Sequence, residues 1–185
     1  MQSQMLTLTY VLRRTTEMGM FLFALVLSWQ DIRSRQVTGK ALFTFTLFSL
    51  FNALLTPVKY WLQFAAGAAA AGLSMLVAAR LSFCMSDREM IGNGDVWFAF
   101  ATALTSGGIS NAFEMLASAF LLALLPAIFV VIRFIYQSFN KKDKIGENPD
   151  PCQESLRDII RYEIPFIPFL AISLLIIRTK TGHSF

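Results

Sequence analysis

The sequence predicts an all-α integral membrane protein, a bundle of about six transmembrane helices. Of the 185 residues, 55% are hydrophobic and the mean hydropathy is +0.55, so a water-soluble fold would expose a large apolar surface. The apolar residues form continuous runs, unlike the alternating pattern of membrane barrel strands. Charged residues make up only 15% of the chain and cluster between these runs. We expect a single membrane domain over residues 1–185.

Six apolar stretches are expected to form the helices. In chain order they cover residues 17–30, 41–55, 60–79, 96–104, 112–136 and 164–177. Several are shorter than the ~20 residues that cross a bilayer at right angles. Such helices need flanking side chains that reach the interface, extra polar turns or local thinning of the bilayer.

Each stretch has its own features. The first follows Arg13 and Arg14 like a signal peptide, but it lacks small residues at a cleavage site and is kept as a helix. The third contains an alanine and glycine run that lets helices approach closely. Between the fifth and sixth lies the longest polar stretch, residues 140–163, expected as a cytoplasmic loop with either a short surface helix or one helical turn.

The positions of basic residues predict the orientation. The loops on one side carry most of the 16 Lys and Arg residues, which places that side in the cytoplasm and both termini outside. The pair Arg13 and Arg14 runs against this assignment. With this topology Asp31 and Asp95 both lie at the cytoplasmic boundary.

Several functions are disfavoured by composition. Cys84 and Cys152 are far apart and the single histidine is His183, so we expect no metal site and no cofactor. The net charge of +4 is explained by cytoplasmic loops, so we expect no nucleic-acid partner.

Asp31 and Asp95 are the candidate functional acids, because both abut apolar stretches at the same predicted depth. Two nearby carboxylates cannot both ionise easily, so one keeps its proton. The charged one can take a proton from water that attacks a peptide carbonyl, and the protonated one can protonate the oxygen and then the leaving amine.

Gly92 and Gly94 precede Asp95, and we expect a helix to begin just after it, at Val96. Glycine permits dihedral angles and a close backbone approach that a side chain would block. A substrate strand could therefore lie against this backbone.

Structural alternatives exist for each acid. Asp95 could simply cap a helix, and Asp31 could be a boundary charge paired with Arg33 or Arg35. At the level of function, the alternatives are a small ion- or proton-coupled transporter component that uses the carboxylates, and a purely structural membrane subunit.

The motif Gly92-Asn93-Gly94-Asp95, after an earlier boundary aspartate, resembles the type IV prepilin peptidases and the archaeal preflagellin peptidases. Residues 31–43, 89–100 and 164–175 resemble three segments of that family in the same order. The resemblance implies an aspartyl endopeptidase of the bacterial inner membrane that removes the short basic leader of prepilin-like precursors at the cytoplasmic face. Its partners would be those precursors and the lipid bilayer.

The resemblance also implies residue roles: Asp31 and Asp95 as the catalytic pair, with Gly92 and Gly94 shaping the site. Trp97 and Ile167 depart from the family pattern, which bears on substrate preference. The chain lacks the paired CxxC motifs of members with a methyltransferase module, so we expect cleavage without methylation. Presenilin-type proteases share the GxGD motif, but they carry a tyrosine where this chain has Gln30.

Overall fold

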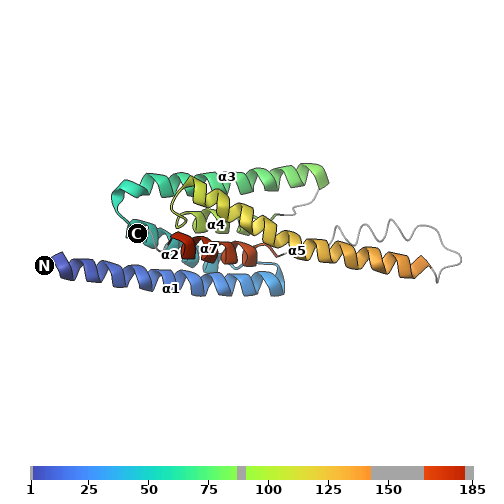
Figure 1. The fold of residues 1–185 in the computed structure, drawn as a ribbon, viewed down its shortest axis with the longest axis horizontal. Coiled ribbons are helices and arrows are strands. Elements are labelled where there is room, and N and C mark those ends of the chain that lie inside the picture. Colours follow the sequence, from blue (N-terminus) through green and yellow to red (C-terminus); the bar gives the residue numbers. More distant parts are fainter. Residues whose placement is uncertain (1, 87–90, 143–164, 182–185) are drawn as a thin grey trace. The chain divides into compact units, whose positions relative to one another are not determined.

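The computed structural model describes residues 2–86, 91–142 and 165–181, and every regular element in these ranges is helical (Figure 1). The elements are α1 (Gln2–Ser34), α2 (Gly39–Leu54), the short 3₁₀ turn η1 (Val58–Tyr60), α3 (Trp61–Ser86), α4 (Asn93–Ala103), α5 (Ile109–Lys142) and α7 (Ile167–Thr181). The predicted all-helical class is confirmed.

Two helical segments are long and apolar enough to cross a membrane, Val58–Cys84 and Ile109–Arg133. Helix α2 is apolar but shorter. The expectation of six transmembrane helices therefore goes beyond what length and composition of the described helices establish.

The chain divides into two compact units. The first contains residues 1–119 and 165–185, and the second contains residues 120–164, of which the structure describes the remainder of α5. All the interactions discussed below lie within the first unit.

Helix α4 lies at the centre of the first unit. It contacts α2, α3 and α7, while α1 contacts α2 and α7. Phe98 of α4 is fully buried and stacks on Phe45 of α2, with ring centroids 4.6 Å apart. A short helix that is buried on most sides holds its first turn in a fixed place, and Asp95 belongs to that turn.

Several helices extend beyond the predicted bounds, including α3, which runs to Ser86 instead of residue 79, and α7, which runs to Thr181 instead of residue 177. Helix α1 begins at Gln2 instead of near residue 17, and α5 runs to Lys142 through Pro126. In the N-terminal part of α1, Thr15 donates its hydroxyl to the Val11 carbonyl, so polar residues are accommodated without an apolar run. Helix α4 also begins earlier than predicted, and this difference is described with the candidate active site. The predicted surface helix and residues 143–163 of the predicted loop lie outside the described residues.

Candidate active site

Asp31 lies in the last turn of α1 and is buried, with 7% of its surface exposed. Its Oδ2 accepts the backbone N–H of Ile167, the first residue of α7, at 3.1 Å. The first N–H groups of a helix have no partner within the helix and favour a negative charge. Asp31 thus joins the C-terminal end of α1 to the N-terminal end of α7.

A tight turn follows Asp31. The N–H of Arg35 donates to the Asp31 carbonyl at 3.0 Å, and Arg35 adopts a left-handed φ of 53° that reverses the chain. The Gln30 side-chain oxygen accepts both the N–H and the hydroxyl of Thr38, at 3.2 and 3.0 Å. These bonds hold the turn that carries Val37 to the start of α4.

Asp95 lies inside the first turn of α4, because the helix begins at Asn93. The predicted start at Val96 is therefore wrong. The Asp95 Oδ2 accepts the N–H of Gly92, the residue that precedes the helix, at 3.2 Å. This is one half of a capping box, since Gly92 has no side chain to complete the other half. Asp95 does cap its helix, but from within it.

The structure brings the two acids within electrostatic reach of one another. Both lie outside the segments of membrane-crossing length. Burial, followed by the negative charge of Asp31, raises the pKa of Asp95 to about 6. Burial also raises the pKa of Asp31, against the opposing effect of backbone N–H groups at Ile167 and Phe166 and the charge of Arg35.

The two carboxyls are therefore unequal. Asp31 is held by two backbone donors that stabilise its charged form, whereas Asp95 has one, from Gly92. When the pair shares one proton, this difference favours the proton on Asp95 and the charge on Asp31. Such a pair can supply an acid and a base from the same residue type.

Gly92 and Gly94 were expected to allow unusual dihedral angles or close packing, and the structure shows neither. Gly92 has ordinary dihedral angles, φ −74° and ψ 154°, and the glycines with positive φ among the described residues are Gly107 and Gly108. A Cβ built on Gly92 would lie 3.8 Å from Asp95 Oδ2, and one on Gly94 3.8 Å from Val37 Cβ. Both are ordinary contact distances, so neither position requires glycine for its dihedral angles or its packing.

The two departures from the family pattern have different surroundings. Trp97 is 57% exposed and meets the Phe100 ring edge-on. The Ile167 side chain is fully buried in the core while its N–H binds Asp31. Sequence reasoning missed the role of this backbone group because every residue except proline carries the same donor.

The predicted absence of a metal is untested by this arrangement. Within the described ranges, no group of three or more metal-ligating side chains comes together. Cys152 and His183 lie outside those ranges.

A helical bundle that places two unequal carboxyls at the meeting point of three helix ends is suited to general acid–base chemistry. The chain belongs to the type IV leader peptidase family, whose sequence profile matches residues 18–132. It is therefore a peptidase, and its substrates are proteins. The matched segment includes Asp31, Asp95 and both glycines, but not α7. Searches of curated proteins and of solved structures found no match.

Proposed function

We propose that this protein is a membrane-embedded aspartyl endopeptidase that removes the short basic leader of type IV prepilin-like precursors at the cytoplasmic face of the bacterial inner membrane. The observation that carries the proposal is the approach of Asp31 and Asp95, two acids far apart in sequence whose carboxyls interact electrostatically. Family membership supports peptide-bond cleavage as their task.

In the proposed reaction, charged Asp31 takes a proton from a water molecule, and the water oxygen attacks the scissile carbonyl carbon. Protonated Asp95 donates its proton to the carbonyl oxygen. As the C–N bond breaks, the proton held by Asp31 passes to the leaving amine, and one hydroxyl proton of the tetrahedral intermediate returns to Asp95, which restores the pair. A pKa of about 6 leaves a minority of Asp95 protonated at neutral pH, enough to supply the acid form.

Gly92 and Gly94 are proposed to leave room for the substrate backbone beside the first turn of α4. A Cβ at either position would meet only ordinary contacts, so packing within the fold does not explain why these residues are glycine. Residues that the fold does not require to be glycine, placed next to the reacting groups, are explained by what must fit against them.

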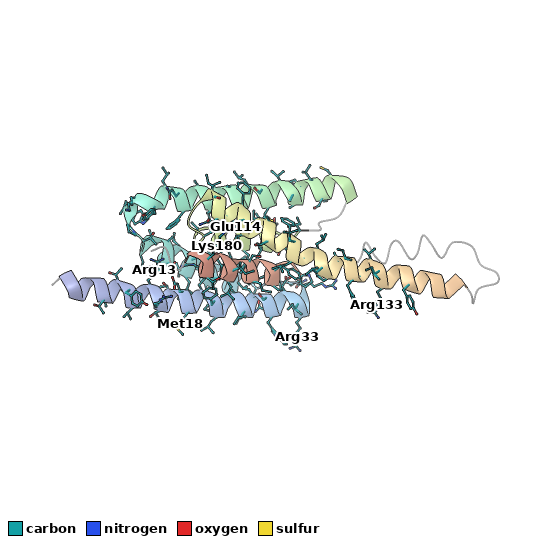
Figure 2. All side chains as sticks on the ribbon, viewed as in Figure 1. Arg13, Met18, Arg33, Glu114, Arg133 and Lys180 are labelled. Carbon is teal, nitrogen blue, oxygen red and sulfur yellow. The ribbon has the colours of Figure 1, made fainter. Side chains whose placement is uncertain are left out.

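The membrane location is supported by the outer face of α1. Met18, Leu22, Leu25 and Trp29 form an exposed apolar stripe, each more than half exposed. Figure 2 shows Met18 pointing away from the other helices. Such a stripe, in a chain that also contains two helices of membrane-crossing length, is typical of a surface that lipid chains cover.

The decisive experiment is a leader-cleavage assay. A tagged prepilin is co-expressed with the wild type, Asp31→Asn or Asp95→Asn, and the size of the precursor is followed on a gel. Asparagine keeps an oxygen that can accept the Ile167 or Gly92 N–H, so both variants should fold. We expect cleavage by the wild type and none by either variant.

Glu114→Gln is the matched control, because Glu114 is a half-exposed acid on α5 that pairs with Lys180. It should cleave like the wild type. Near wild-type cleavage by Asp31→Asn or Asp95→Asn would refute the pair mechanism.

A further inference from the structure

A second polar site lies at the opposite end of the α1 and α7 pair. Because Asp31 meets the first residue of α7 and Glu17 meets Arg178 near its end, the two helices are antiparallel. Figure 2 labels Arg13 at this end of α1 and Arg33 at the other. A cavity of about 420 Å³ opens here, with Tyr10, Arg13, Arg14, Glu17, Asn52 and Arg178 among its lining residues.

Arg178 is the most constrained of these groups, since only 14% of its side chain is exposed. One terminal nitrogen donates to Glu17 at 2.7 Å, and the other donates to the Asn52 side-chain oxygen at 2.6 Å. The third nitrogen, Nε, is buried and has no hydrogen-bond partner among the described residues. A buried guanidinium N–H without an acceptor is costly, so Arg178 is only partly neutralised by its surroundings.

The charges around this cavity are also unbalanced. Glu17 is shared by three arginines: Arg178, Arg14 at 3.1 Å and Arg13 at 3.4 Å. Among the described residues that line the cavity, Glu17 is the only acid. Three cations against one carboxylate leave an excess of positive charge beside a partly desolvated guanidinium, which favours a bound anion.

The cavity walls define the class of anion. Arginine presents several donors in a planar fork that matches phosphate oxygens. The volume is far larger than one small ion needs, since a water molecule takes about 30 Å³. Phe21, Phe64, Leu104 and Leu175 line other parts of the same cavity. Charged donors on one side and apolar walls on the other suit an amphiphilic ligand.

We propose that this cavity binds an anionic phosphoester, with the headgroup of an acidic glycerophospholipid as its ligand. The phosphate accepts from Arg14, the most exposed of the three arginines, and the charge of Arg178 attracts it. The glycerol and first acyl carbons contact the apolar walls. The site is separate from the aspartate pair, and the proposal does not depend on the protease activity.

The binding experiment uses the full chain purified in an uncharged detergent. Short-chain phosphatidylglycerol, short-chain phosphatidylcholine and glycerol 3-phosphate are titrated separately by microscale thermophoresis. Saturable binding of phosphatidylglycerol, with at least tenfold weaker binding of phosphatidylcholine, is the expected result. Equal saturable binding of glycerol 3-phosphate would keep the phosphoester chemistry and assign the site to a soluble ligand. Equal binding of both lipids, or binding of none of the three, would overturn the proposal.

Variants separate a specific site from diffuse attraction. Arg14→Gln should weaken phosphatidylglycerol binding roughly tenfold or more, the loss expected for a charged hydrogen bond. Arg14 has a side chain 62% exposed, so its loss should leave the fold intact. Lys180→Gln is the matched control, because it removes the same charge from α7 but does not line the cavity. Equal losses in Arg14→Gln and Lys180→Gln would refute a built site.

A further variant is expected to increase the affinity instead of lowering it. Glu17→Gln removes the competing carboxylate, so it should tighten phosphatidylglycerol binding. A purely structural role for the network predicts no such gain. Unchanged or weakened binding by folded Glu17→Gln protein would count against the proposal.

Discussion

The two ends of the α1 and α7 pair hold their charges by different means. At one end, Asp31 and Asp95 are two acids held by backbone N–H groups, two for Asp31 and one for Asp95. At the other end, Glu17 and Arg178 are opposite charges that bind side chain to side chain. Backbone donors bias a proton without fixing it, so the first end can change its charge state. A salt bridge between strongly ionised groups fixes the charges, so the second end suits binding and stability.

The largest expected difference between the ends is in the free energy of unfolding. Glu17→Leu leaves Arg178 buried without a carboxylate, and breaking a buried pair in this way costs about 3–5 kcal/mol. Asp31→Asn keeps an acceptor for the Ile167 N–H and should lose far less. Thermal unfolding in detergent followed by circular dichroism would measure both. Equal destabilisation would show that the two ends are held alike.

The next effect is a pH dependence that belongs to the aspartate end. The pKa of folded Asp95, about 6, lies above its ordinary value of 3.8, so the folded state binds this proton more tightly than the unfolded state does. The stability from this group is complete below pH ~4 and is lost as pH rises through about 6. The raised pKa of Asp31 acts in the same direction.

We therefore expect the melting temperature of the wild type to fall between pH 4 and pH 6.5. Asp95→Asn should flatten this slope, whereas Glu114→Gln should retain it. A wild-type slope left intact in Asp95→Asn would contradict the assignment of the raised pKa to this carboxyl.

Replacing one glycine near each end with alanine should also distinguish the ends, because only one of the two glycines is closely packed. A Cβ on Gly67 would lie 2.9 Å from the backbone of Gly108, in the turn next to the arginine end, so Gly67→Ala should cost about 1–3 kcal/mol. Gly94→Ala meets no close atom and gains helix propensity, up to about 1 kcal/mol. If the substrate lies against α4, Gly94→Ala should nevertheless slow leader cleavage. Chemical denaturation and the gel assay, run on the same preparations, would test both statements.

The smallest effect concerns Lys180 and Glu114, which form an exposed pair near the arginine end. Lys180→Gln should change the free energy of unfolding by less than about 1 kcal/mol. A larger loss in thermal unfolding would mean that this pair belongs to the buried network.

Much of the fold followed from continuous apolar runs. The second stretch was expected at residues 41–55 and is α2, Gly39–Leu54. The start of α4 was missed because a local side-chain bond decides it: the Asp95 carboxylate reaches back to the Gly92 N–H and extends the helix by three residues. Apolarity carries no information about such a bond.

The candidate acids could be found from sequence because ionisable groups next to apolar helices are rare. The partners of Asp31 could not, since a backbone N–H has no sequence signature. The cluster around Arg178 was equally hidden. Its bond to Glu17 depends on α1 and α7 packing antiparallel, which neither helix reveals alone.

The bond between Asp31 and Ile167 has a consequence for the order of synthesis. A ribosome makes both acids well before it reaches Ile167, so for much of its synthesis the nascent chain contains Asp31 and Asp95 without the donor that biases their shared proton. The proposed pair matures only when α7 docks beside α1. A chain that stalled before α7 would carry the whole GxGD motif and still lack the Ile167 N–H that Asp31 accepts.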